Sequence, residues 1–411
     1  MKTLIKSALS ACFCLFFLIS VCQEKSLPNV TVPFILDHNR MLVDAEIQRT
    51  DGSWRKVRLW VDTGNPTFTM SEPLARDLGI DLPARDNGNA GNSNVEVPSP
   101  SSIRIGGMTL NLEGVKSKVL FQPFWLFTTM HNDANLPSTV LKQYQIVFDY
   151  PGRKLTIALP GSLAHQGIPS PARVNPKTGI IQMDAVIDGD SMSFALDNGA
   201  SYSFISEDKL LKISEKHPGW PGITGTAGCA NMWGWWPPNE QTFSLVRIAE
   251  IVWGKVKLSD VGIVGVPAFS AEGPTLGAWY SKKSALPVDG FLGTNAFKAY
   301  RVEIDYLNAM VWLKKGAEPD KHEMDLAGLS LHQLADSSYQ VVGVVQKDGK
   351  PLVDGVVSGD ILFSIGNLDP KGATMGTVVD ALRGKPGEFR VLGIERDGKR
   401  FRIEAKVEHL F

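Results

Sequence analysis

Two segments of this sequence each carry an aspartate that is followed, two residues later, by a glycine. Asp62 lies in LWVDTGNPTFTMSE, residues 59–72, and Asp197 lies in FALDNGASYSFISE, residues 194–207. In each segment an apolar run precedes the aspartate, a β-rich run follows the glycine, and Ser-Glu closes the segment. A single Asp-x-Gly is ordinary turn chemistry, but two at matched positions indicate a pair of carboxyl groups with a shared role.

A pair of adjacent carboxyl groups can hydrolyse a peptide bond without a metal. Two such groups cannot both ionise easily, so they share one proton. The ionised group takes a proton from water while the protonated group polarises the carbonyl of the bond to be cleaved. Gly64 and Gly199 permit tight loops whose backbone N–H groups are free to support the carboxylates. We therefore predict that Asp62 and Asp197 are catalytic.

A second pair of segments repeats in the same order and defines the elements that must position the aspartates. YQIVFDYPGRKLTI, residues 144–157, matches YRVEIDYLNAMVWL, residues 300–313, and each has the pattern of a β-hairpin. Two blocks repeated in order predict two homologous β lobes, residues 28–160 and 161–316, with one aspartate each. The Ser-Glu pairs predict short helices over 72–79 and 207–214.

These motifs resemble the pepsin/retropepsin-like aspartic peptidases. VDTG at 61–64 matches the catalytic signature of that family, LDNGAS at 196–201 is a variant of it, and GFLGTNAF at 290–297 resembles the apolar-apolar-Gly element behind the catalytic loop. The resemblance covers residues 30–315. It implies a mainly β fold, two acid-protease-like lobes with a cleft between them, and an endopeptidase that acts on a peptide or protein substrate.

The sequence departs from the family pattern at several positions. The resemblance implies hydroxyl groups that brace the two loops across the interface; Thr63 supplies one, whereas Asn198 would have to bridge to Thr63 through its amide. Ala200 stands where the family has a hydroxyl bonded to the aspartate, and residues 135–141 replace the first lobe's apolar-apolar-Gly element. The alternatives are a catalytically inactive peptide-binding protein on this scaffold, or a lobe pair that serves only in assembly.

Two loops are candidates for binding substrate. The polar, glycine-rich residues 85–102 fit a mobile flap over the cleft. Residues 225–240 carry Trp233, Trp235 and Trp236, which we expect to line an apolar substrate cleft; packing against the neighbouring lobe is an equal alternative. The DGDS at 188–191 begins like a calcium loop but lacks its closing glutamate, so we predict a hairpin turn there.

The last part of the chain, residues 325–411, resembles a bacterial PDZ domain. SGDILFSI at 358–365 carries the most specific part of the likeness, followed by a predicted helix over 375–383 and a hairpin turn at Asp397-Gly398. The likeness implies a peptide ligand with a free C-terminus, while a module that only stiffens the second lobe is the alternative. The implied carboxylate-binding loop consists of Gly328, Leu329, Ser330 and Leu331.

The N-terminus has the three-part order of a secretory signal. Lys2 and Lys6 precede an apolar stretch over 8–21 that is short for a membrane span, and polar residues follow. We predict a signal peptide over 1–22 and an exported protein, periplasmic or secreted. Lipid attachment at Cys22, which would make it a lipoprotein, ranks second, and a retained anchor helix ranks third.

Composition and cysteine usage exclude several classes of function. The net charge of −1 gives no reason to expect nucleic acid or an anionic membrane surface as a partner, so we expect membrane contact only through a lipid at Cys22. Cys229 is the only cysteine beyond the leader, so the mature chain forms no internal disulfide. No metalloprotease, serine-hydrolase or phosphate-loop motif is present, and we predict no metal and no organic cofactor.

Overall fold

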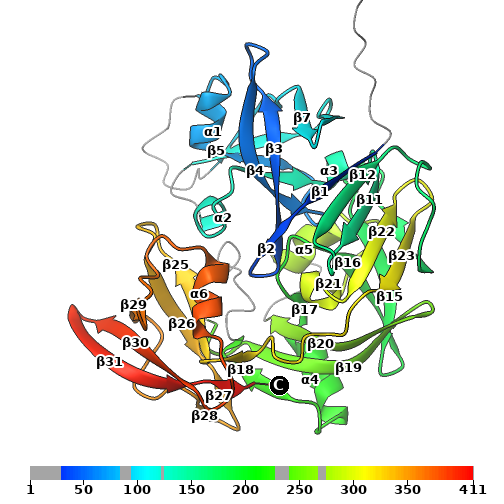
Figure 1. The fold of residues 1–411 in the computed structure, drawn as a ribbon. Helices are drawn as coiled ribbons and strands as arrows, with labels where there is room; N and C mark the ends of the chain where they lie inside the picture. The colour runs from blue at the N-terminus through cyan, green and yellow to red at the C-terminus, as the bar shows by residue number, and fades with distance from the viewer. Residues whose placement is uncertain (1–28, 84–93, 122–124, 227–239, 267–274, 411) are drawn as a thin grey trace, which may run out of the picture.

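A computed structural model describes residues 29–83, 94–121, 125–226, 240–266 and 275–410 (Figure 1). The chain is mainly β, with sheets of six, nine, ten, two and five strands. Two large β lobes are followed by a smaller module near the C-terminus (Figure 1). The predicted fold class, mainly β with two similar lobes, is confirmed.

The first lobe is built on the nine-stranded sheet, whose strands all come from residues 35–137. Apolar side chains on one face of these strands are buried against the short helices α1 (Glu72–Asp77) and α3 (Ser138–Leu141). The helix α2 (Trp125–Thr128) lies in the chain between the strands β9 and β10. The strands are β2 (Ile35–Asp37), β3 (Arg40–Gln48), β4 (Trp54–Asp62), β5 (Phe68–Ser71), β6 (Asn94–Val97), β7 (Ser102–Ile105), β8 (Met108–Asn111), β9 (Ser117–Leu120) and β10 (Ala134–Pro137).

The second lobe is built on the ten-stranded sheet and carries the helices α4 (Glu207–Lys216) and α5 (Leu276–Ser281) and the 3-10 turn η2 (Thr294–Ala296). The last two strands at one end of this sheet, β27 (Gln346–Lys347) and β28 (Lys350–Pro351), come from the C-terminal module. The others are β14 (Arg173–Val174), β15 (Ile181–Ile187), β16 (Asp190–Leu196), β17 (Ser203–Ser206), β18 (Gly222–Thr224), β19 (Ser244–Trp253), β20 (Val256–Val266) and β21 (Gly290–Leu292).

Both lobes thread the chain in the same way. In the first lobe β4 pairs in parallel with β10, β10 pairs antiparallel with β5, and β5 pairs in parallel with β9. In the second lobe β16, β21, β17 and β20 follow the same order with the same orientations. The segment Ala134–Pro137 therefore takes the place in lobe one where the sequence showed no apolar-apolar-Gly element.

Local signals in the sequence explain several boundaries. Ser71 caps α1, because its side-chain oxygen accepts a hydrogen bond from the Leu74 N–H at 3.3 Å. The helices predicted over 72–79 and 207–214 are found as α1 and α4. Asp188 and Gly189, with φ of 52° and 81°, form the turn between β15 and β16, which confirms the predicted hairpin at DGDS.

The six-stranded sheet joins the two lobes. The two predicted hairpins are β11–β12 and β22–β23, and they pair with each other through β11 and β22, with Gln145 opposite Asp305 and Asp149 opposite Arg301. The second repeated block of each lobe thus meets its counterpart. The strands are β1 (Asn29–Pro33), β11 (Gln145–Asp149), β12 (Lys154–Ala158), β13 (Ile168–Pro171), β22 (Tyr300–Asp305) and β23 (Met310–Lys315).

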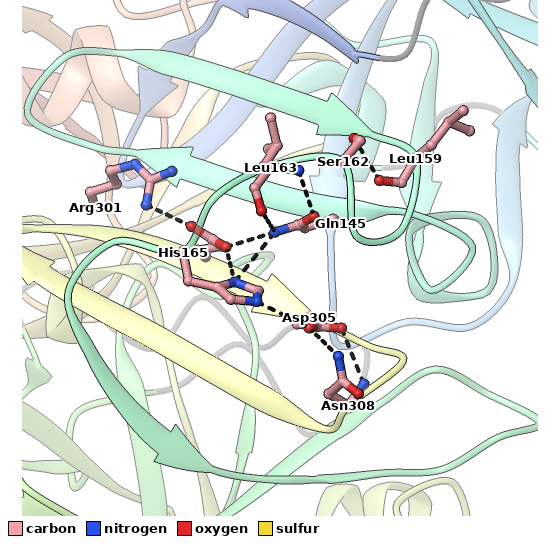
Figure 2. Close-up of polar contacts among 9 residues, drawn as sticks. Gln145, Leu159, Ser162, Leu163, His165, Arg301, Asp305 and Asn308 are labelled. Carbon is pink, nitrogen blue, oxygen red and sulfur yellow. Dashed lines mark hydrogen bonds and ion pairs between the residues drawn. The ribbon is translucent and has the colours of Figure 1, made fainter.

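A buried polar cluster lies at this junction (Figure 2). The Glu303 side chain is fully buried, and its Oε1 lies 2.7 Å from both Gln145 Nε2 and His165 Nδ1. Arg301 Nη1 lies 2.8 Å from Glu303 Oε2, and His165 Nε2 lies 3.7 Å from Asp305 Oδ2. A buried carboxylate is tolerated when its oxygens are paired in this way. The cluster fastens the connection between the lobes to the sheet that both lobes share.

The C-terminal module has a five-stranded sheet with the helix α6 (Met375–Leu382) packed on it. The helix predicted over 375–383 and the hairpin turn at Asp397 and Gly398, with φ of 52° and 73°, are both found. The strands are β25 (Leu329–Gln333), β26 (Tyr339–Val344), β29 (Ile361–Ile365), β30 (Phe389–Arg396) and β31 (Lys399–Lys406), with the separate pair β24 (Asp325–Leu326) and β32 (Glu408–His409).

Some predictions concern residues outside the described parts of the chain. These are the signal peptide with Cys22, the body cysteine Cys229, and the first half of the flap candidate, residues 85–93. Export and lipid attachment stay predictions. In the part of the chain that the structure describes, no helix is long and apolar enough to span a bilayer.

Candidate active site

Two loops from different lobes meet at the predicted aspartates. β4 ends at Asp62, and β16 ends at Leu196, directly before Asp197. A Cβ atom added to Gly64 would lie 2.3 Å from Asp197 Cγ, and one added to Gly199 would lie 2.4 Å from Asp62 Oδ1. Each glycine therefore packs against the carboxyl group of the opposite lobe, at a distance that no larger residue fits.

Backbone N–H groups bind both carboxyl groups in a matched way. Gly64 N donates to Asp62 Oδ1 at 3.0 Å, and Gly199 N donates to Asp197 Oδ1 at 2.9 Å. The next residue adds a second bond in each loop: Ala200 N donates to Asp197 Oδ1 at 3.2 Å, and Asn65 N donates to Asp62. The two glycines named from the sequence thus have the supporting contacts expected of them.

Thr63 and Asn198 bridge the two loops. The Asn198 N–H donates to Thr63 Oγ1 at 3.0 Å, and the Thr63 N–H donates to Asn198 Oδ1 at 2.8 Å. The Thr63 hydroxyl also donates to the Leu196 carbonyl at 3.0 Å. The amide oxygen of Asn198 therefore supplies the acceptor that a hydroxyl would supply, so this departure from the family pattern leaves the bracing of the loops intact.

The two carboxyl groups are buried and coupled. Asp62 is 3% exposed and Asp197 is 6% exposed, and the two side chains share a hydrogen bond. Burial raises the pKa of Asp62 well above its ordinary value, and the neighbouring charge of Asp197 raises it further. Burial also raises the pKa of Asp197, although hydrogen bonds from Tyr280, Gly199 and Ala200 act in the opposite direction. One shared proton is the charge state that this environment favours.

The sequence did not point to Arg40, which lies beside the pair. Its side chain is buried, and its Nε donates to the Gly199 carbonyl at 3.3 Å. Burial lowers the pKa of Arg40 to about 10, so the guanidinium stays charged at neutral pH, with Asp37, Asp197 and Asp62 among the acids that favour its charge. A buried cation at this position fits a carboxyl pair that carries one negative charge.

Tyr280 is the second residue that the sequence did not reveal. Its hydroxyl donates a hydrogen bond to Asp197 Oδ2. The side chain is 4% exposed, and its ring lies 5.2 Å from the ring of Phe291, which belongs to the strand threaded beside β16. Burial raises the pKa of Tyr280 well above its ordinary value, so the hydroxyl remains a donor.

The hairpin formed by β2 and β3 reaches from the first lobe toward the second lobe and the C-terminal module (Figure 1). His38 and Asn39, with φ of 45° and 64°, form its turn. Asp37 Oδ1 accepts the Gly376 N–H at the start of α6 at 2.9 Å, and Asn39 Nδ2 donates to Glu323 Oε1 at 2.7 Å. The turn next to Arg40 is therefore fixed by the C-terminal module and by the segment that leads to it.

The loop implied to bind a peptide carboxylate is enclosed. Gly328, Leu329, Ser330 and Leu331 are all buried. The Ser330 hydroxyl donates to the Gly225 carbonyl of the second lobe, so that lobe covers the loop on one side.

The tryptophans Trp233, Trp235 and Trp236 lie outside the described residues, so their place in a substrate cleft stays a prediction. Over the described ranges, no cluster of three or more histidine, cysteine, aspartate or glutamate side chains is arranged to hold a metal ion.

Comparisons with known proteins give a distant structural likeness. No protein-family model matches the sequence, and no curated protein matches it. Among solved structures, the chain is similar to the crystal structure of aspartic proteinase from Irpex lacteus, with a TM-score of 0.38 and 12% identity, over 70% of this chain and 97% of that chain.

Proposed function

We propose that the chain is an aspartic endopeptidase in which Asp62 and Asp197 activate water. The observation that carries the proposal is the pair of buried carboxyl groups, which come from matched loops of two lobes and share a hydrogen bond. Matched glycine N–H donors and the reciprocal bridge between Thr63 and Asn198 support the same function, because they hold the pair rigidly before substrate binds.

The chemistry follows from the shared proton. The ionised carboxyl takes a proton from water as the water oxygen attacks the carbonyl carbon of a peptide bond. The protonated carboxyl gives its proton to the carbonyl oxygen, which leaves a neutral tetrahedral diol. Collapse of the diol requires a proton on the leaving nitrogen, and the carboxyl that took the proton from water can supply it. As the diol collapses to the carboxylic acid, the other carboxyl takes a proton from one of the diol hydroxyl groups, so the pair returns to its starting charge.

The first test is digestion of a peptide library by the purified mature chain over a range of pH. We expect cleavage with a bell-shaped pH profile, because the pair is inactive with two protons or with none. Burial raises the pKa of both carboxyl groups, so both limbs should lie above the ordinary aspartate pKa of about 3.9.

The rival function is peptide binding without turnover on the same scaffold. Ala200, which lacks the hydroxyl that the family places beside the aspartate, is the residue that favours this rival. A mature protein that retains peptides in the library but cleaves none at any pH would establish the rival and exclude the endopeptidase.

We also propose that residues 325–411 form a PDZ-like module that adds a peptide strand at β25. In its sheet β25 pairs with β26 and lies at the edge. Ala327 N donates to the Leu382 carbonyl at 3.0 Å, and Gln333 Nε2 donates to the Ala373 carbonyl at 3.4 Å, so both ends of α6 are tied beside β25. An edge strand beside a helix is the arrangement that accepts an added strand.

Binding to this module should depend on a free C-terminal carboxylate. We expect apolar C-terminal peptides to bind the full chain about tenfold or more tightly than their amidated forms, because a hydrogen bond to a charged group contributes about 1.5–3 kcal/mol. An array of paired free and amidated peptides measures the difference. Equal binding of the two forms would remove the carboxylate-binding role from Gly328, Leu329, Ser330 and Leu331.

A further inference from the structure

The backbone donors around the two aspartates are matched, but the side-chain donors are not. Asp62 and Asp197 each accept the N–H of the glycine two residues on and the N–H of the residue after it. Asp197 additionally accepts the Tyr280 hydroxyl at its other oxygen. Among the residues that the structure describes, no hydroxyl donates to Asp62 in the same way. The two carboxyl groups therefore differ by one strong donor.

We infer that Tyr280 is a positioning residue that makes Asp197 the ionised member of the pair and leaves the shared proton on Asp62. The inference rests on the proposed function and assigns a separate role to each aspartate. A hydroxyl that donates to a carboxylate stabilises the ionised form, because the bond is charge-assisted and lies in a site shielded from water. In the proposed reaction, Asp197 then takes the proton from water and Asp62 protonates the carbonyl oxygen.

Tyr280 supplies the side-chain hydroxyl donor to Asp197 that residue 200 lacks. Ala200 binds Asp197 only through its backbone N–H, because its side chain has no hydroxyl. The Tyr280 hydroxyl comes instead from α5, and Tyr280 lies 83 positions after Asp197 in the chain. Its ring is held between the edge of Trp279, at 5.0 Å, and Phe291, at 5.2 Å. A buried donor held by aromatic packing keeps its direction without further ordering when substrate binds.

The remaining charges near Asp197 act in the same direction. Arg40 lies against the Asp197 loop through the Gly199 carbonyl, and its positive charge favours the ionised form of Asp197. Arg40 also faces Asp62, Asp37 and Glu240, whose negative charges favour its charged form. The negative charges of Asp62 and Asp197 oppose each other, and a proton on Asp62 removes this opposition.

The test measures the titration midpoint of Asp197 with and without the Tyr280 hydroxyl, and it does not depend on peptide cleavage. Carboxyl carbons of ¹³C-labelled aspartate are followed by NMR against pH in Asp62→Asn and in Asp62→Asn/Tyr280→Phe, so that Asp197 titrates alone. We expect the Asp197 midpoint to rise by about 1 pH unit when the hydroxyl is removed, because one charge-assisted hydrogen bond to the ionised form is lost. Phenylalanine fills the same space, so the fold should be retained.

Tyr300→Phe is the matched control. Tyr300 is also a buried tyrosine of the second lobe, 8% exposed, and its hydroxyl donates to the Lys257 carbonyl at 2.9 Å, away from the aspartates. It reports the general effect of losing a buried hydroxyl. We expect Tyr300→Phe to leave the Asp197 midpoint unchanged. An equal shift in both variants, or no shift with Tyr280→Phe, would overturn the assigned role.

A rescue variant separates positioning from simple packing. Ala200 N lies 3.2 Å from Asp197 Oδ1, so the hydroxyl of Ala200→Ser would lie within reach of the same carboxyl group. In Asp62→Asn/Tyr280→Phe/Ala200→Ser we expect the Asp197 midpoint to return toward the value with Tyr280 present. In the active chain, Tyr280→Phe should move the acid limb of the kcat/KM profile to higher pH and lower kcat more than it changes KM.

The two hypotheses fail in different ways. If the wild-type chain cleaves no peptide but Tyr280→Phe still raises the Asp197 midpoint, the proposed endopeptidase activity is wrong and the role of Tyr280 stands. If the chain cleaves peptides and the midpoint and acid limb are both unmoved, the activity stands and the role of Tyr280 is wrong.

Discussion

Asp62→Asn and Asp197→Asn should each remove peptide cleavage while leaving the fold in place. An amide nearly preserves the shape of the carboxyl group and can still accept the glycine N–H at 3.0 Å or 2.9 Å, so the loops keep their bonds. Loss of either group removes the general base or the general acid, each of which contributes about 10²–10⁴-fold to the rate. The measurement is kcat/KM on a library-selected peptide, with circular dichroism and thermal unfolding to report the fold.

The double variant tests whether the aspartates act as a unit. Because base and acid serve one step, Asp62→Asn/Asp197→Asn should be little worse than either single change. Asp149→Asn is a matched control, since Asp149 ends β11 and its Oδ1 accepts the Gly152 N–H at 3.0 Å in the turn that follows. It should cleave as the wild type does. Wild-type cleavage by either active-site variant would exclude the aspartic mechanism.

Gly199→Ala and Gly64→Ala should each damage the site of the opposite lobe. The new Cβ would lie 2.4 Å from Asp62 Oδ1 in the first case and 2.3 Å from Asp197 Cγ in the second. The loops must separate to accept it, which lengthens the bridge between Thr63 and Asn198. We expect a loss of stability of about 1–3 kcal/mol, as for other overpacked sites, together with a loss of kcat of at least about 100-fold, as expected from an ångström-scale misplacement.

Gly219→Ala controls for the change of residue type. Gly219 lies in the same lobe as Gly199 and has open space around the position of its Cβ. It should tolerate alanine with an effect on the unfolding temperature much smaller than that of Gly199→Ala. If Gly199→Ala keeps both the unfolding temperature and kcat of the wild type, the close packing of the two loops does not exist in solution.

The repeated blocks were sufficient to predict the lobes and the meeting of Asp62 with Asp197. A duplicated segment must fold in the same way twice, so matched residues take matched places about the axis between the copies. The sequence could not reveal Tyr280 or Arg40 as neighbours of the pair. Tyr280 is brought to the site by a short helix with no motif of its own, and Arg40 follows a hairpin turn whose direction depends on the C-terminal module.

The replacement of a hydroxyl by Asn198 shows the limit of reading a family pattern by residue type. Asn198 differs from the expected threonine or serine, yet its amide oxygen accepts the Thr63 N–H at 2.8 Å. What the loop requires is an acceptor at that point, which several side chains can supply. Similarly, the Ser330 hydroxyl is covered because it donates to the Gly225 carbonyl of the second lobe, and no local pattern in residues 328–331 reports that contact.

The mutual packing of the two glycines has a consequence for how the site depends on concentration. Gly64 packs against the carboxyl group of Asp197, and Gly199 packs against that of Asp62. One lobe alone therefore holds no complete site. Here both halves are covalently joined and share one sheet, so each half meets its partner at an effective concentration that dilution does not change. The fraction of chains with an assembled site is therefore the same in a dilute solution as in a concentrated stock.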